Sequence, residues 1–349
     1  MNRILLTLCA ASSMAALAGT PALARDQIRI VGSSTVYPFT TAVAEGFGKS
    51  SGMKTPVVES TGTGGGFKLF CAGVGEDTPD FNDASRPIKK AEFETCVKNG
   101  VTDIVEIKVG FDGLTIANAA TGPKTSLTKQ QIFMALAKQV PDKDGKLVDN
   151  PYKMWNQIDP ALPAEKIEVL GPPPTSGTRD SLHELIMEPG AEKFEALAKL
   201  KATDAKAYET VWKSMRTDGA YVEAGENDNL IVQKLEANSK AFGIFGYSFL
   251  AANTGKIKAA KVENETPTFE TIASGAYKVS RPLFIYAKKQ HVGQIPGMAE
   301  FLAEYTSAKA LSADGYLADK GLVPLPAADA KTSLDTAKAM TILTADKVK

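Results

Sequence analysis

The chain has 349 residues, of which 44% are hydrophobic, so it is long enough for two domains and can bury a sizeable core. The 40 Lys and Arg residues balance the 40 Asp and Glu residues, and the formal net charge is zero. Because a nucleic-acid-binding protein usually carries a basic excess or a basic stripe, this composition argues against a nucleic-acid partner.

The N-terminal segment predicts a secretory signal peptide over residues 1–24. Arg3 provides a small positive region, residues 4–18 form an apolar run, and the Ala-Leu-Ala sequence at residues 22–24 is a suitable cleavage site. The apolar run is too short and too rich in small residues for a membrane anchor. We therefore expect a periplasmic protein whose mature chain begins at Arg25.

Removal of this signal peptide leaves two cysteines, Cys71 and Cys96. Two thiols of an exported chain usually pair in an oxidising compartment, so we predict a disulfide between them. Two separate buried thiols are the alternative. The two histidines, His183 and His291, are far apart and no CxxC motif is present, so the sequence predicts no metal site and no cofactor.

Short β-prone runs alternate with stretches of helical spacing, which predicts an α/β fold. The first third of the chain predicts, in order, strand 27–31, helix 38–47, strand 56–59, a helix that begins at residue 67, and strands 101–108 and 113–118. The middle third predicts helix 127–140 with Ser126 as its N-cap, strand 166–170, helix 179–187 and helix 193–215. The last third predicts helix 230–235, a buried strand at 242–247, strand 283–287 and helix 296–305.

Two passages are candidates for crossings between domains, residues 111–113 and residues 279–282. If the chain crosses at both, residues 25–112 and 280–349 form one lobe and residues 113–279 form the other. A ligand cleft would then lie between the lobes, where α/β proteins usually bind their ligands.

Three segments share one chemistry, and each lies between a predicted strand and a predicted helix. They are the first loop, residues 32–35 (Gly-Ser-Ser-Thr), the second loop, residues 61–66 (Thr-Gly-Thr-Gly-Gly-Gly), and the third loop, residues 175–178 (Thr-Ser-Gly-Thr). Glycine lets the backbone approach a ligand closely, while serine and threonine cap helix starts and supply hydroxyl donors. A helix N-terminus adds unpaired N–H groups and the positive end of the helix dipole. If the three loops converge, they would bind an oxyanion without a lysine cluster.

Nucleotide motifs and a hydrolase triad are disfavoured. Phe67 occupies the position at which both the Walker A motif and the dinucleotide fingerprint require glycine. Ser176, Asp180 and His183 have the residue types of a triad, but no G-x-S-x-G elbow is present and the last two would share one helix face. We therefore expect no catalytic residues and interpret His183 as a surface or hydrogen-bonded side chain.

Arginines near the loops are candidates for the positive charge that an anion needs. Arg86 offers a planar donor fork that suits phosphate oxygens, and a surface ion pair with Asp83 is the alternative. Arg179 would either reach the anion or pair across the cleft. Residues 227–229 (Asn-Asp-Asn) precede a helix, and capping of that helix is their simplest interpretation.

In their order and spacing these motifs resemble the periplasmic phosphate-binding proteins of high-affinity phosphate ABC transporters, the PstS family, and within it a branch with cyanobacterial members. The resemblance covers nearly all of the mature chain. It rests on GSSTVYP at residues 32–38, GTGGGFK at 62–68, DASRPI at 83–88, TSGT at 175–178, AFGIFGY at 241–247 and GLVPLP at 321–326.

The resemblance implies a two-lobed type II binding-protein fold that clamps phosphate between its lobes, is monomeric and delivers the anion to a membrane permease. It implies neither a cofactor nor covalent chemistry. The positions that match the family's phosphate-binding segments are Ser34, Thr35, the Val36 backbone, Thr63, Gly64, Ser176, Gly177 and Thr178.

Two positions depart from the family pattern. Ser85 stands where many members have the aspartate that accepts the proton of HPO₄²⁻, and Pro172 stands where many have an arginine. Arg86 would take over the role of that arginine. Sulfate brings no proton, so a buried acceptor would be left unpaired beside it and would disfavour it. The candidates for this acceptor are Asp83, Glu226 and Asp228.

These observations predict a receptor for inorganic phosphate. A receptor for another tetrahedral oxyanion, sulfate or molybdate, is the first alternative. A secreted phosphoesterase is the second alternative, and it would need a nucleophile with a positioned base or a metal site, which two isolated histidines do not supply.

Overall fold

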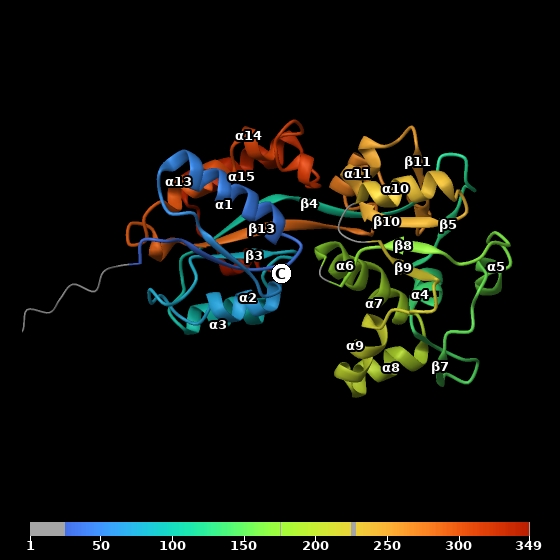
Figure 1. Cartoon of the computed structure of the whole chain (residues 1–349). Helices are drawn as coiled ribbons and strands as arrows, with labels where there is room; N and C mark the ends of the chain where they lie inside the picture. The colour runs from blue at the N-terminus through green and yellow to red at the C-terminus, as the bar shows by residue number, and fades with distance from the viewer. Residues whose placement is uncertain (1–24, 175, 225–227, 349) are drawn as a thin grey trace, which may run out of the picture.

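The computed structural model describes residues 25–174, 176–224 and 228–348. The signal peptide predicted for residues 1–24 therefore lies outside the described residues. These residues form a large mixed sheet with helices packed on it (Figure 1). In this part of the chain no helix has both the length and the apolar character needed to cross a membrane.

The first half of the sheet is built on β1 (Arg29–Gly32), which pairs in parallel with β2 (Val57–Ser60) on one side and β3 (Phe81–Ala84) on the other. β13 (Ser280–Lys288) pairs antiparallel with β3, and β4 (Ile104–Ala119) pairs antiparallel with β13. Because β1, β2 and β3 point the same way, the segments that follow them emerge at one edge of the sheet.

The second half begins where β4 leaves β13 and pairs with β10 (Phe242–Gly246). β8 (Val169–Gly171) and β9 (Tyr221–Glu223) follow in parallel with β10, and β11 (Ile257–Ala259) pairs with the end of β4. The full order is β2-β1-β3-β13-β4-β10-β8-β9. Shorter pairs join β5 (Ser126–Leu127) to β12 (Lys261–Val262), and β6 (Gln139–Pro141) to β7 (Leu147–Asp149).

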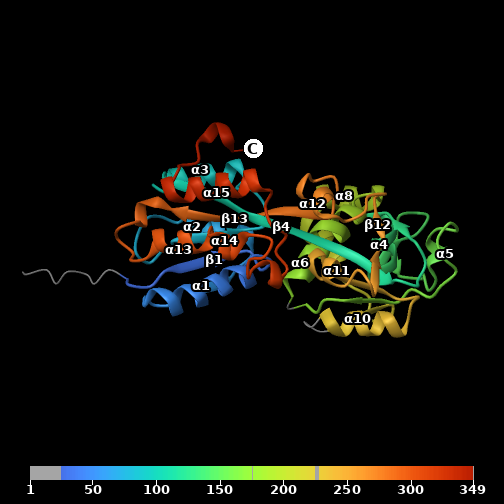
Figure 2. The same cartoon turned by 90° about the horizontal axis from the view of Figure 1, so that it is seen from above.

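Helices cover both faces of the first half (Figures 1 and 2). Side chains alternate along β13, so Leu283 and Ile285 enter one core while Phe284 and Tyr286 enter the other. The first core is covered by α1 (Tyr37–Ser51), α13 (Met298–Tyr305), α14 (Ala308–Leu311) and α15 (Ala327–Ala339). The second core is covered by α2 (Thr63–Phe70) and α3 (Lys90–Lys98).

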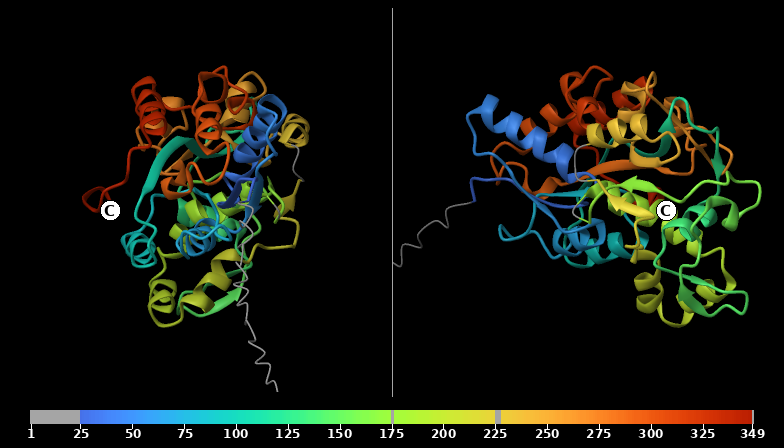
Figure 3. Two further views of the ribbon diagram at one scale, coloured as in Figure 1. Left: turned by 90° about the vertical axis from the view of Figure 1, so that its left-hand side faces the viewer. Right: turned by 45° about the vertical axis from the view of Figure 1, so that its right-hand side comes forward.

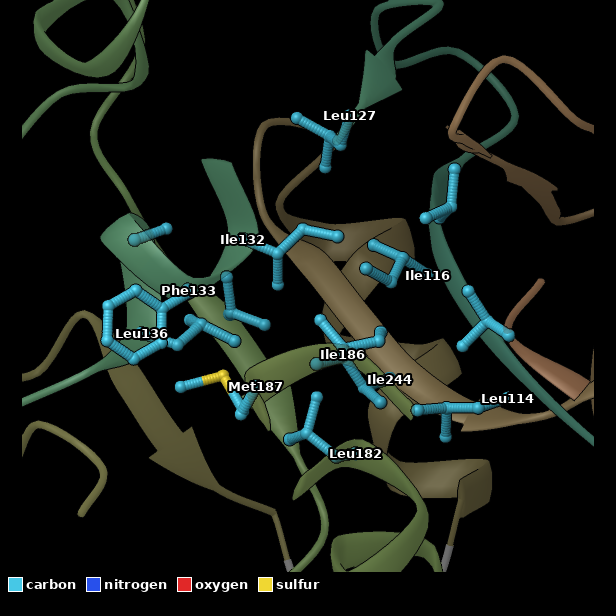
Figure 4. Packing of buried hydrophobic residues seen from close by; sticks show 14 of the residues in the cluster. Leu114, Ile116, Leu127, Ile132, Phe133, Leu136, Leu182, Ile186, Met187 and Ile244 are labelled. Atoms are coloured by element: carbon cyan, nitrogen blue, oxygen red, sulfur yellow. The ribbon is translucent and has the colours of Figure 1, made fainter. Parts of the chain in front are cut away.

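The second half has its own core, in which Leu114 of β4 and Ile244 of β10 meet Ile132 and Ile186 (Figure 4). A π-helical turn, His183–Met187, joins two of its helices. The helices of this half are α4 (Lys129–Leu136), α5 (Trp155–Ile158), α6 (Gly177–Leu182), α7 (Glu188–Ala191), α8 (Glu195–Thr203), α9 (Ala205–Lys213), α10 (Asp228–Ala237), α11 (Tyr247–Ala252) and α12 (Phe269–Ala273).

The prediction of separate strands at residues 101–108 and 113–118 is wrong. The structure has one continuous strand, β4, which runs through residues 111–113. Gly110 and Gly113 do not interrupt it, because β13 pairs with β4 as far as Gly113 and β10 takes over from Leu114. The register shifts between Leu283 and Phe284, so the pairing of the two long strands is irregular near the middle of β4.

Two helix predictions also need correction. The helix expected at residues 127–140 is limited to α4, and its N-cap is Thr128, whose side chain accepts the Gln131 N–H, rather than Ser126. The helix expected at residues 193–215 is divided into α8 and α9 at Asp204, whose carboxylate accepts the Ala207 N–H. In both cases a side-chain cap sets the helix boundary locally, in agreement with the capping preferences of these residue types.

The predicted disulfide is confirmed. Cys71, directly after α2, is bonded to Cys96 in α3, and both residues are buried. The chain that this disulfide encloses is also held by the buried carboxylate of Asp80, which lies 2.7 Å from His291 Nδ1 and 2.8 Å from Arg25 Nη2. His291 is therefore part of the packing of the first half.

Candidate functional site

A cleft of about 440 Å³ lies between the two halves of the sheet. The first loop follows β1 and the third loop follows β8, so each approaches the cleft from the carboxyl end of a parallel strand. α1 and α10 lie on the same side of the molecule, one in each half (Figure 3). The residues that line the cleft include Ser34, Thr35, Asp112, Gly177, Thr178 and Ser181.

The first loop leads into the N-terminus of α1, which is 15 residues long. The Tyr37 N–H donates to the Ser33 carbonyl at 2.9 Å and closes the turn. Within the described residues, the N–H groups of residues 34–36 have no hydrogen-bond acceptor. Three unpaired donors and the positive end of the α1 dipole therefore meet at the cleft, which is an arrangement suited to an anion.

The third loop meets the first loop directly across the cleft. Ser176 caps α6, since its hydroxyl accepts the Thr178 N–H at 3.2 Å. A Cβ on Gly177 would lie 2.8 Å from the Ser34 carbonyl oxygen, so the two loops approach as closely as their backbones allow. The Ser34 hydroxyl also donates to the Asp180 carboxylate in α6. The structure thus brings Ser34, Thr35, Ser176, Gly177 and Thr178 to one cleft, and Val36 is buried. Their role in phosphate binding stays a prediction.

Arg281 belongs to this site and was missed by the sequence analysis, which placed it only in a crossing passage. It is 8% exposed, and its Nη2 donates to the Thr35 hydroxyl at 2.7 Å and to the Ser181 hydroxyl at 2.9 Å. Its guanidinium also pairs with Glu184, and its Nε lies 3.5 Å from Asp112 Oδ2. Arg281 lies just outside the strand predicted at residues 283–287, and no local motif marked it as a site residue.

The second loop takes a different form from the one predicted. α2 begins at Thr63, so the glycines at residues 64–66 lie inside the helix. The Thr63 hydroxyl lies 3.1 Å from the Ser85 hydroxyl and accepts the Ser85 N–H at 3.1 Å. Thr63, Gly64, Ser85 and Arg86 form a second group next to the first loop, and among the described residues they are not part of the cleft lining.

Arg86 pairs with Glu92 rather than with Asp83. Its Nη1 and Nη2 donate to the two carboxylate oxygens of Glu92 at 2.8 and 2.7 Å. Burial raises the pKa of Glu92, but the Arg86 guanidinium outweighs this effect and holds that pKa below its ordinary value. The charge of Arg86 is therefore compensated within the first half, and a contact between Arg86 and an anion stays a prediction.

Arg179 does not pair across the cleft, and that alternative was wrong. Its Nε donates to the Pro172 carbonyl at 2.9 Å, its Nη2 donates to Glu223 at 2.7 Å, and its guanidinium stacks on the Tyr221 ring. All these partners belong to the second half. Arg179 is 4% exposed, so its side chain is a buried part of that half.

Asp83 is fully buried behind the first loop and is absent from the described lining of the cleft. Its carboxylate accepts a 2.9 Å hydrogen bond from Thr40, and Thr40 lies 2.9 Å from the Tyr305 hydroxyl. Burial raises the pKa of Asp83 well above its ordinary value. Glu226 and the side chain of Asp228 lie outside the described residues, although Asp228 begins α10.

His183 is neither exposed nor hydrogen-bonded through Nε2, so its interpretation as a surface or hydrogen-bonded side chain was wrong. It packs edge-on against Trp212, and burial lowers its pKa to about 4. In the described residues no cluster of three or more His, Cys, Asp or Glu side chains forms a metal site. Ser176 uses its hydroxyl to cap α6.

Comparisons with known proteins agree with this architecture. Residues 18–309 match the model of the PBP superfamily domain. Protein SphX of Synechococcus elongatus is 32% identical over 302 residues, which cover 85% of this chain and 77% of that protein. The phosphate-binding protein PstS of Staphylococcus saprophyticus is 31% identical over 304 residues, which cover 85% of this chain and 80% of that protein.

Solved structures give the same result. One is the crystal structure of a possible phosphate binding protein from Planctomyces limnophilus, whose sequence is 30% identical to this chain. The two structures superpose with a TM-score of 0.70, and the match covers 90% of this chain and 97% of that one. An ABC-type phosphate transport receptor from Vibrio cholerae shares the fold at 21% identity, with a TM-score of 0.54 over 86% of this chain and 100% of that one.

Proposed function

Because this chain belongs to the PBP superfamily and, within it, to the PstS family, we propose that it is a solute receptor that binds inorganic phosphate and delivers it to the permease of an ABC transporter. The names of its relatives give the ligand, and the cleft supplies the chemistry to hold it. We place the receptor in the periplasm as a monomer.

The observation that carries this proposal is the contact between the first and third loops. It brings the unpaired N–H groups of residues 34–36 and the start of α6 to the same cleft. Hydroxyl groups of Ser34, Thr35 and Thr178 lie beside them. Backbone N–H groups and hydroxyls surround a tetrahedral anion from several directions without a lysine cluster.

We also propose that the two halves are the lobes of a clamp, residues 25–112 with 280–349 and residues 113–279. β4 and β13 pass between them, and their irregular pairing near Leu283 is the expected site of bending. The bonds from Ser34 to Asp180 and from Arg281 to Ser181 join the two lobes and would form as the lobes close.

Calorimetric titration of the mature protein, freed of bound anion by unfolding and refolding, tests the ligand. Phosphate should bind tightly, while sulfate and molybdate should bind at least about a hundredfold more weakly. Tighter binding of sulfate or molybdate would assign the receptor to that anion. Turnover of a chromogenic phosphate ester by metal-supplemented protein would instead favour a phosphoesterase.

A further inference from the structure

The contacts of Arg281 suggest a specific role for this residue in phosphate binding, and this inference rests on the proposed function. We propose that Arg281 is a positioning residue for the anion: it fixes the Thr35 hydroxyl as a donor into the cleft and holds a positive charge behind it.

The first observation is the place of Arg281 in the fold. It lies in β13 opposite Asp112 of β4, where these strands pass from one half to the other. It is 8% exposed, although arginine is seldom buried unless its charge is paired. Thr35, Asp112 and Ser181 all line the cleft and all lie within 3.5 Å of its guanidinium nitrogens. Arg281 therefore lies directly behind the cleft wall.

The second observation is the direction of the hydrogen bonds. A guanidinium group only donates, whereas a hydroxyl has one proton to donate and two lone pairs. Because Arg281 Nη2 donates to Thr35 Oγ1 at 2.7 Å, the Thr35 oxygen is the acceptor and its own proton must point elsewhere. Thr35 lines the cleft, so this proton is free to donate to an anion oxygen there.

Ser181 shows the opposite outcome with the same arginine. Its hydroxyl accepts from Arg281 at 2.9 Å, but it donates its proton to Asp112 Oδ2 at 2.5 Å. Ser181 is thus occupied on both sides, and Thr35 is the hydroxyl that Arg281 prepares for a ligand. Asp112 in turn keeps the guanidinium in place from the β4 side.

The third observation concerns charge. Arg86 and Arg179 donate to Glu92 and Glu223 within their own halves. Arg281 has two carboxylate neighbours, Glu184 and Asp112, and within the described residues its Nε is buried without a hydrogen-bond partner. Arg281 differs from these two arginines in its position: its Nη2 lies 2.7 Å from the hydroxyl oxygen of Thr35, so its positive charge lies directly behind this cleft residue.

A double-mutant cycle measured by phosphate calorimetry tests this proposal. In the wild-type background Thr35→Val should weaken phosphate binding about tenfold, and Arg281→Met should weaken it about tenfold or more. In the Arg281→Met background the further loss from Thr35→Val should be no more than about twofold, because the hydroxyl is no longer oriented. Thr35→Ser, which keeps the hydroxyl, should remain near wild type.

Arg216→Met is the matched control. The Arg216 side chain is 3% exposed and pairs with Asp218, so its loss also removes a buried guanidinium, but from a place outside the cleft lining. It should lower the melting temperature and leave phosphate affinity within about twofold. If Arg281→Met does not fold, as judged by circular dichroism, Arg281→Lys takes its place in the same cycle.

The outcomes separate the two proposals. If wild type binds phosphate and Thr35→Val costs the same factor in both backgrounds, the positioning role of Arg281 is wrong while the phosphate receptor stands. If wild type binds no phosphate, the receptor and the role of Arg281 are both wrong.

Discussion

At the scale of single residues, close approach between backbones accounts for two glycines of the loops. A Cβ on Gly66 would lie 2.6 Å from the Gly32 Cα, and a Cβ on Gly177 would lie 2.8 Å from the Ser34 carbonyl oxygen. Real Cβ atoms are not found so close to backbone atoms. These glycines are therefore required because the second and third loops pack directly against the first loop.

Thr178 offers a direct test of the cleft as the phosphate site. Its hydroxyl lies in the first turn of α6 and lines the cleft. Thr178→Val keeps the shape and removes a charge-assisted hydrogen bond worth roughly 1.5–3 kcal/mol, so phosphate affinity should fall about tenfold or more. His183→Ala, in the turn that follows α6, should change the affinity by no more than about twofold. Equal losses in the two variants would place the anion elsewhere.

The buried imidazole of His183 predicts a pH dependence of stability. Burial lowers its pKa to about 4 in the folded protein, whereas its pKa in the unfolded chain is about 6.5. Between these values the unfolded chain binds more protons than the folded one, so stability should fall as the pH drops from about 6.5 towards 4. Thermal melts at a series of pH values measure this fall.

His183→Gln provides the comparison, because glutamine does not titrate and His291 is retained. Its melting temperature should depend less steeply on pH in the same window. Parallel curves for the variant and wild type would show that other groups determine the pH dependence.

The sequence alone pointed to the polar residues of the first and third loops, because glycine, serine and threonine directly before a predicted helix form a local pattern that indicates a ligand-binding helix start. Arg281 had no such local signal, since its partner Thr35 is 246 positions away. The pairing of Arg86 with Glu92 was also missed, although the two are only six residues apart, because it depends on how the chain turns into α3.

At the scale of elements, the second loop is a place where tertiary packing overrides the low helix propensity of the local sequence. A run of glycines disfavours a helix, and a loop was predicted there. The structure starts α2 at Thr63, because a helix in this position lets Gly66 pack onto Gly32 and brings Phe67 and Phe70 into the core. The favourable packing of these residues thus outweighs the free-energy cost of placing three glycines in a helix.

The disulfide joins two elements, the end of α2 and α3, and its contribution is measurable. Its cysteines are separated by 25 positions, for which the chain-entropy model gives roughly 3 kcal/mol. Thiol titration of the denatured, unreduced protein should find no free thiol, and the Cys71→Ser, Cys96→Ser double variant should melt several degrees lower. Two thiols per wild-type chain would contradict the bond in solution. Reductant should lower the melting temperature of wild type only.

At the scale of the whole molecule, the proposed closure depends on how closely the third loop approaches the first. Gly177→Ala places a methyl group against the Ser34 carbonyl, so the cleft should close less fully and phosphate affinity should fall about fivefold or more. Alanine is also the better helix former, so α6 itself should not be destabilised. Calorimetry measures the affinity, and small-angle scattering with saturating phosphate should give a larger radius of gyration than wild type.

Gly255→Ala is the matched control, since a Cβ at Gly255 would meet no atom within 4 Å. It should leave both the affinity and the scattering curve unchanged. Wild-type affinity in Gly177→Ala would show that the approach of the two loops does not limit binding.

The α/β class was predictable because strand-like and helical runs alternate along the chain. The order of the sheet was not, because it depends on pairings between distant segments. β13 pairs with β3 across about 200 positions, and β4 stays continuous because β13 and β10 support it in succession. Neither pairing can be inferred from the local amino-acid composition.

The position of β13 between β3 and β4 also constrains how the protein is made. Until the strand at residues 280–288 has left the ribosome, β3 and β4 have no neighbour on their facing edges. A nascent chain that folded early would therefore expose two unpaired strand edges, which are prone to aggregate. The strands of the second half all precede β13 in the chain, so they can pair with one another before β13 is made. A chain truncated before β13 is left with an open sheet in the first half.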